Sequence, residues 1–146
     1  NMIEETIKVT GDVQIKLVGP DGKVKQEQTI KNLVVTTGKQ YIASRMTGTT
    51  TAMSHMAVGS GVTAAAAGDT ALGTQLGRVA LTSATTTGAV TTYVASFPAG
   101  TGTGAVTEAG VFNAASGGTM LCRTVFAVVN KGVDDGMTIT WAITVS

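Results

Sequence analysis

Charged residues are scarce in this sequence. Asp, Glu, Lys and Arg make up 13% of its 146 residues, about half the usual ~25% of a globular chain. The stretch from 46 to 130 is nearly neutral, and its charged residues are Asp69, Arg78, Glu108 and Arg123. The net charge is +1, so the chain has no strong field to attract nucleic acid or anionic lipid. We therefore expect no nucleic-acid partner and no membrane partner.

Long apolar runs, cysteine and histidine are scarce as well. No run reaches 18 apolar residues, so we expect no membrane-spanning helix. Cys122 is the one cysteine, which excludes an internal disulfide, and His55 is the one histidine. Together they cannot supply the four ligands of a usual zinc site. Both lie in apolar, strand-like segments, so we expect them to pack in the core rather than form a catalytic dyad.

Motifs of known chemistry are also missing. The sequence has no Gly-x-Ser-x-Gly elbow, and its glycine-rich stretches 59–61 and 100–104 match no phosphate-binding loop, so we interpret them as turns. Asp134 and Asp135 suggest calcium, but Ca²⁺ needs about six to eight oxygen ligands, and a solvated turn is the simpler interpretation. The sequence thus predicts no catalytic, cofactor-binding or metal site, and we expect that the protein is not an enzyme.

What the sequence does contain is a series of short segments rich in Val, Ile and Thr, separated by turn residues. Such segments are typical of β-strands. The expected strands are 13–17, 23–30, 52–60, 78–83, 90–97, 106–112, 119–126 and 137–145. The sequence predicts a mainly β fold with one domain over residues 1–146. This domain is an antiparallel β-sandwich or flattened barrel of about seven to eight strands with one short α-helix.

The one convincing helix begins near Thr37. Thr37 and Gln40 have the spacing of a capping box, Ile42 and Met46 share a face, and the helix should end near Gly48. About three turns are too few to stand alone, so the helix should pack on the sheet.

Three hairpins are expected. Segments 13–17 and 23–30 join through a turn at 19–22, and the lysines of the second arm suit an exposed edge strand. Segments 78–83 and 90–97 should pair across residues 84–89. The long loop at 62–77 that precedes them is of a length that is usually functional or disordered.

The third hairpin, residues 106–126, organises the chain. If Phe112 lies opposite Thr119, Glu108 lies opposite Arg123, and these are the only charges in the two arms. A cross-strand pair of this kind contributes roughly 0.2–1 kcal/mol and resists a slip in register. The alternative is a catalytic carboxylate at Glu108, for which no second acid, base or nucleophile lies close in sequence.

The last strand alternates strongly. Ile139, Trp141, Ile143 and Val145 share one face, which we expect to be core, and threonines dominate the other face. A chain with this much Thr, Ala and Gly and so little charge makes a poor independent surface. The simplest interpretation is that copies of the chain or a larger assembly cover much of it. The alternative is a self-sufficient β-domain coated with threonine hydroxyls.

Several segments from Asn32 onward resemble those of small virion structural proteins of tailed bacteriophages. These segments are 32–38, 56–61, 67–73, 107–114, 117–123 and 138–143, which read NLVVTTG, MAVGSG, AGDTALG, TEAGVFNA, GGTMLCR and TITWAI. Members of this group are capsid decoration (cement) proteins or tail-fibre and collar components. No catalytic residue comes with the resemblance, and residues 1–31 match it less distinctly.

The resemblance implies a capsid decoration protein that binds the outside of the head and stabilises it against the pressure of packaged DNA. We then expect a location on the virion after synthesis in the bacterial host cytoplasm, contact with the major capsid protein, and self-association as a homotrimer. The N-terminal hairpin, residues 1–31, or the long loop would be the attachment element.

The alternative hypothesis is a tail-fibre or collar component that binds a host-surface glycan or another tail protein. A surface groove lined by Tyr41 or Tyr93 would favour the glycan.

Overall fold

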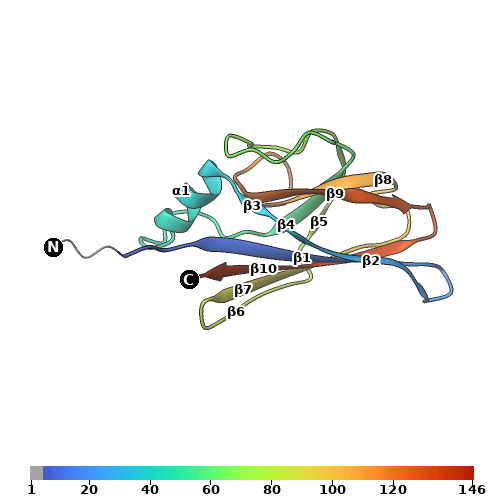
Figure 1. Cartoon of the computed structure of the whole chain (residues 1–146), viewed down its shortest axis with the longest axis horizontal. Helices are drawn as coiled ribbons and strands as arrows, with labels where there is room; N and C mark the ends of the chain where they lie inside the picture. The colour runs from blue at the N-terminus through green and yellow to red at the C-terminus, as the bar shows by residue number, and fades with distance from the viewer. Residues whose placement is uncertain (1–4) are drawn as a thin grey trace.

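The computed structural model describes residues 5–146 and shows a sandwich of two five-stranded antiparallel sheets (Figure 1). Residues 1–4 of the expected N-terminal attachment element lie outside the described residues. The mainly β prediction with one short helix is confirmed. The elements in chain order are β1 (Val9–Val18), β2 (Val24–Lys31), β3 (Leu33–Val34), α1 (Thr36–Ser44), β4 (His55–Gly59), β5 (Gln75–Ala80), β6 (Ser83–Thr87), β7 (Val90–Phe97), β8 (Gly104–Phe112), β9 (Met120–Lys131) and β10 (Gly136–Val145).

The first sheet has the strand order β2-β1-β10-β7-β6. The predicted hairpin of β1 and β2 is confirmed, and β2 is an edge strand, as its lysines suggested. Strand β10 lies in the middle of this sheet, where Ile139, Trp141 and Ile143 turn their side chains into the core. Val145 does not share their burial, because it lies at the strand end and is 40% exposed.

The second sheet has the order β3-β9-β8-β4-β5 and faces the first across the main core. Apolar side chains from both sheets meet there, among them Trp141, Phe97, Val58 and Leu121. A second, smaller cluster of Val35, Ala57, Phe112 and Met120 lies apart from this core, with Leu72 of the long loop packed against it. The loop arches over the upper sheet in Figure 1.

The helix α1 lies at the end of the sandwich where the described chain begins and ends (Figure 1). The predicted capping box is wrong: Val35 is the N-cap residue without a side-chain cap, and the Thr37 hydroxyl donates instead to the Met120 carbonyl at 2.9 Å. Met46 falls beyond the helix and is 88% exposed. The helix contacts β9 through Gly38, where an added Cβ would lie 1.9 Å from the Leu121 carbonyl oxygen.

One predicted hairpin is wrong. Strand β7 pairs with β6, whereas the segment predicted as its partner largely forms β5, which pairs with β4 in the other sheet. Sequence pattern favoured the wrong segment because β6, Ser83-Ala-Thr-Thr-Thr87, is exposed at every residue and so needs no apolar face. With the two-residue β3, it accounts for the strands beyond the predicted seven to eight.

Candidate functional site

Glu108 is the centre of the most elaborate polar cluster among residues 5–146. Its side chain is fully buried on β8, yet it remains saturated with hydrogen bonds. Oε2 accepts the backbone N–H groups of Gly61 at 2.6 Å and Thr74 at 2.8 Å, and Oε1 accepts that of Gly73 at 2.8 Å. In the structure the long loop runs from 60 to 74, because the last residues of the predicted loop already belong to β5. These donors lie at its two ends, which are also joined by the Ser60 N–H donating to the Thr74 carbonyl. One carboxylate therefore closes the base of the loop.

Arg123 of β9 completes the cluster. Its Nη2 lies 3.0 Å from Glu108 Oε1, and the same nitrogen donates to the Thr63 carbonyl at 3.0 Å. Its Nη1 donates to Asp69 Oδ2 at 2.9 Å. Arg123 is only 3% exposed, so its ion pair with Glu108 is shielded from water, whereas Asp69 remains partly exposed. The guanidinium thus ties the middle of the loop to the carboxylate at its base.

Glu108 and Arg123 are paired, but not in the predicted register. Glu108 lies opposite Val125, Arg123 lies opposite Gly110, and Phe112 lies opposite Met120. The ladder shifts between Val106 and Glu108 and again between Val111 and Phe112. Because such irregularities add a residue to one strand, the two charges meet diagonally. Counting outward from the turn could not reveal them.

Burial by itself would raise the pKa of Glu108. The hydrogen bonds from the backbone of Thr74, Gly73 and Gly61, with that from Arg123, outweigh burial and hold the pKa of this carboxyl below its ordinary value. A general acid or base must reach a substrate proton. The Glu108 carboxylate has neither exposure nor a free lone pair directed outward, so its geometry suits an anchor and not the catalytic alternative.

The sequence did not identify the backbone donors of this cluster. The sequence predicts ordinary turn and loop residues at Gly59, Gly61 and Gly73, whereas the structure packs these glycines against the carboxylate. An added Cβ would lie 2.4 Å from Glu108 Oε2 at Gly61 and 2.6 Å from it at Gly59. Glycines on both sides of a long loop, together with a lone acid in an apolar strand, were the available signal. Only the fold shows that they belong together.

His55 and Cys122 do not form a dyad. They lie on β4 and β9, and β8 runs between these strands. His55 Nδ1 is 2.7 Å from its neighbour Ser54 Oγ. Cys122 is fully buried, and burial raises the pKa of its thiol. A buried neutral thiol is a poor nucleophile, in keeping with the packing role expected for it.

The turn at Asp134 and Asp135 is held by lysines. Lys25 Nζ lies 2.9 Å from Asp135 Oδ2, which also accepts the Gly132 N–H, and Lys131 Nζ donates to the Asp135 carbonyl at 2.7 Å. The hydrogen bond from Lys25, followed by that from Gly132, lowers the pKa of Asp135. Within residues 5–146, no group of three or more His, Cys, Asp or Glu side chains is placed to hold a metal ion. The same residues contain no helix long and apolar enough to cross a membrane.

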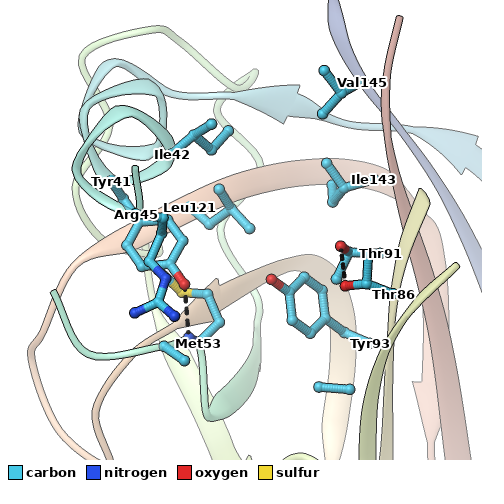
Figure 2. Close-up of a pocket in the computed structure, with 12 residues that line it drawn as sticks. Tyr41, Ile42, Arg45, Met53, Thr86, Thr91, Tyr93, Leu121, Ile143 and Val145 are labelled. Atoms are coloured by element: carbon cyan, nitrogen blue, oxygen red, sulfur yellow. Dashed lines mark hydrogen bonds between the residues drawn. The ribbon is translucent and has the colours of Figure 1, made fainter. Parts of the chain in front are cut away.

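A pocket of about 330 Å³ opens between α1 and the sheet that contains β7. Figure 2 shows Tyr41, from the helix, and Tyr93, from β7, on facing sides of it, with Arg45 beside Tyr41. The Tyr41 hydroxyl accepts the Met53 N–H at 3.2 Å. Burial is the main cause that raises the pKa of Tyr93. Both residues are only 8% exposed, so little of either ring is open to solvent.

Comparison of the chain with protein-family models, with curated protein sequences and with solved structures gave no match.

Proposed function

We propose that this protein is a structural component of a phage virion, and specifically a capsid decoration protein that binds the outside of the head. The observation that carries the proposal is a long uncharged part of the exterior. From Val79 to Thr107 the chain has no charged residue, although β6 within that stretch is exposed throughout. Interface centres are depleted of charge, and a surface without ions can be covered by protein without leaving a charge unpaired.

A decoration protein would act by adding interface between neighbouring subunits of the major capsid protein. Each square ångström of apolar surface that this interface buries contributes roughly 25 cal/mol, and expansion of the shell under DNA pressure would have to break it. The anchored loop supports this role, because Glu108 and Arg123 hold its base and middle in one conformation before binding. Preorganised contacts lose less conformational entropy on association. Self-association as a homotrimer belongs to the same proposal.

The test is co-sedimentation of purified protein with emptied, expanded shells of the phage that encodes it. We expect saturable binding to the shells and antibody labelling of heads in electron micrographs of virions. Labelling confined to tails, or no binding to shells, would contradict the proposal. Shells in their unexpanded form provide a control for nonspecific adsorption.

A second candidate is a tail-fibre or collar component that binds a host-surface glycan. The pocket lined by both Tyr41 and Tyr93 favours it. It ranks second because sugars usually stack on open aromatic faces, and these two rings are largely covered. Under this alternative, a glycan array should show selective binding that weakens in Tyr93→Phe, which removes a hydroxyl from the pocket without removing the ring. Equal binding by the variant would exclude this pocket as the glycan site.

A further inference from the structure

Strand β6 is an edge with no protection. It ends the order β2-β1-β10-β7-β6 and pairs only with β7. All five of its residues are exposed, so neither face of the strand is covered. In an antiparallel ladder, alternate residues direct their N–H and C=O groups away from the paired neighbour. This outer row of backbone groups is therefore free to pair with another strand.

The other edge strands of the described fold have features that hinder pairing with another strand, namely charge, a register shift or short length. Strand β2 has charged residues, namely Lys25, Glu27 and Lys31, and a register shift against β1. Strand β5 carries Arg78 and a register shift against β4. Strand β3 has only two residues. Lysines, bulges and short length are the devices that keep sheet edges apart.

Strand β6 has none of these devices. It contains no charge and no proline, its register with β7 is continuous, and β7 is uncharged as well. Its side chains are small, and all but that of Ala84 carry a hydroxyl, such as that of Thr86, which lies 2.8 Å from the Thr91 hydroxyl of β7.

We propose that β6 pairs with β6 of a second copy of this chain, antiparallel, about a two-fold axis near Thr85. A second copy suits this edge because an antiparallel pair of identical strands is its own complement. The copies bring no like charges together there, and cross-strand threonine pairs are favourable. The two sheets would join into one, with Ala84 of each copy opposite Thr86 of the other.

The joined sheet has a consequence for the pocket. Ala84 and Thr86 contribute to its lining. The axis of an antiparallel pair runs perpendicular to the sheet, so the inner faces of both copies point to the same side. The two pockets would therefore flank the seam. This contact is separate from the three-fold contact of the proposed homotrimer, because a self-complementary edge joins two copies only.

The test compares the mass of wild type with that of Thr85→Lys by sedimentation equilibrium over a concentration series. Wild type should contain an even number of copies, which is six where the three-fold contact also forms. Thr85→Lys should have half the mass, because it places like charges opposite each other at the axis. Mixing Thr85→Lys with Thr85→Glu should restore the wild-type mass. Thr6→Lys adds the same charge at an exposed residue outside the strands and should keep the wild-type mass.

An odd number of copies in wild type, including a monomer, would overturn the proposal. So would an unchanged mass of Thr85→Lys, or a failure of the Lys and Glu variants to associate when mixed. Fluorescence of the buried Trp141 reports that each variant is folded, so that a lost contact is not confused with a lost fold. These outcomes do not depend on whether the protein binds a phage head.

Discussion

At the scale of single residues, Glu108 is the side chain that joins the base of the long loop to β9. It is fully buried and charged, and its partners come from β9 and from both ends of the long loop. A buried charge is tolerated only when it is paired and hydrogen-bonded. Removing any one partner therefore leaves the other buried groups without all of their hydrogen-bond partners.

The first prediction concerns Glu108→Gln. The amide has the same shape but no charge, and its NH₂ group would face backbone donors and Arg123. We expect a loss of about 3–5 kcal/mol in the free energy of unfolding, as for other broken buried pairs. Urea titration followed by Trp141 fluorescence measures it. Glu27→Gln on the exposed β2 edge is the matched control and should lie within ~0.5 kcal/mol of wild type. A Glu108→Gln protein as stable as this control would show that the cluster contributes nothing.

The second prediction concerns pH. The pKa of Glu108 is lowered in the folded protein, whereas an unfolded Glu titrates at about 4.3. Its contribution is therefore present above the unfolded pKa and is lost as pH falls through the folded pKa. The stability difference between wild type and Glu108→Gln should be constant from about pH 6 to 8 and shrink below about pH 4. Urea titrations of both proteins from about pH 3 to 8 measure this difference in the free energy of unfolding. A difference that does not shrink in acid would contradict the prediction.

At the scale of elements, the long loop and α1 are positioned by glycines. Gly61 allows the loop to approach Glu108, and Gly38 allows the helix to approach β9. In both places the missing side chain decides the distance between elements. The hydrophobic pattern predicts that a helix packs on a sheet, but it does not give the distance between them. Only the contacts at these glycines show that distance.

The third prediction uses two glycines of this region. Gly61→Ala would place a Cβ 2.4 Å from the Glu108 carboxylate, and overpacking of this kind costs about 1–3 kcal/mol. Gly68→Ala is the matched control within the loop, because its Cβ would meet nothing within 4 Å. We expect Gly61→Ala alone to lower the free energy of unfolding and to speed hydrogen exchange at Gly73 and Thr74. Equal effects of the two substitutions would mean that contact with Glu108 is irrelevant.

At the scale of the whole molecule, the sandwich excludes water from one continuous core that reaches both sheets. Cys122 lies in that core and is fully buried, and burial raises the pKa of its thiol. It therefore has no route to a reagent while the sheets remain packed. Reaction of Cys122 with a thiol reagent therefore reports unfolding of the whole sandwich.

The fourth prediction follows from that position. In native buffer Cys122 should react with a thiol-specific disulfide reagent only as fast as the protein unfolds, and in concentrated urea it should react at once. The rate should rise in Glu108→Gln by the same factor as the unfolding rate that a urea jump measures for this variant. Rapid modification of the native protein, with unchanged Trp141 fluorescence, would contradict the packing of the two sheets around Cys122.

The local pattern of apolar and polar residues was sufficient to identify the strands that bury one face. Alternation identified β1 and β10, and turn residues identified the hairpin of β1 with β2. The same logic failed for β6, because a strand exposed on both faces has no alternation. It also failed for the register of β8 with β9, because irregularities in the ladder leave no mark in the spacing of Glu108 and Arg123.

By itself the sequence determined the class of the fold, the face of β10 that enters the core, and the lack of charge along residues 79–107. The fold class and the core face follow from the two-residue period of a strand, and the lack of charge follows from composition. Neither property depends on which strands become neighbours. Only the tertiary structure decided that Glu108 binds both ends of a loop far away in sequence, that Tyr41 and Tyr93 face one pocket, and that β6 is the unprotected edge. Contacts of this kind depend on which strands become neighbours, and that is settled by the packing of the whole chain.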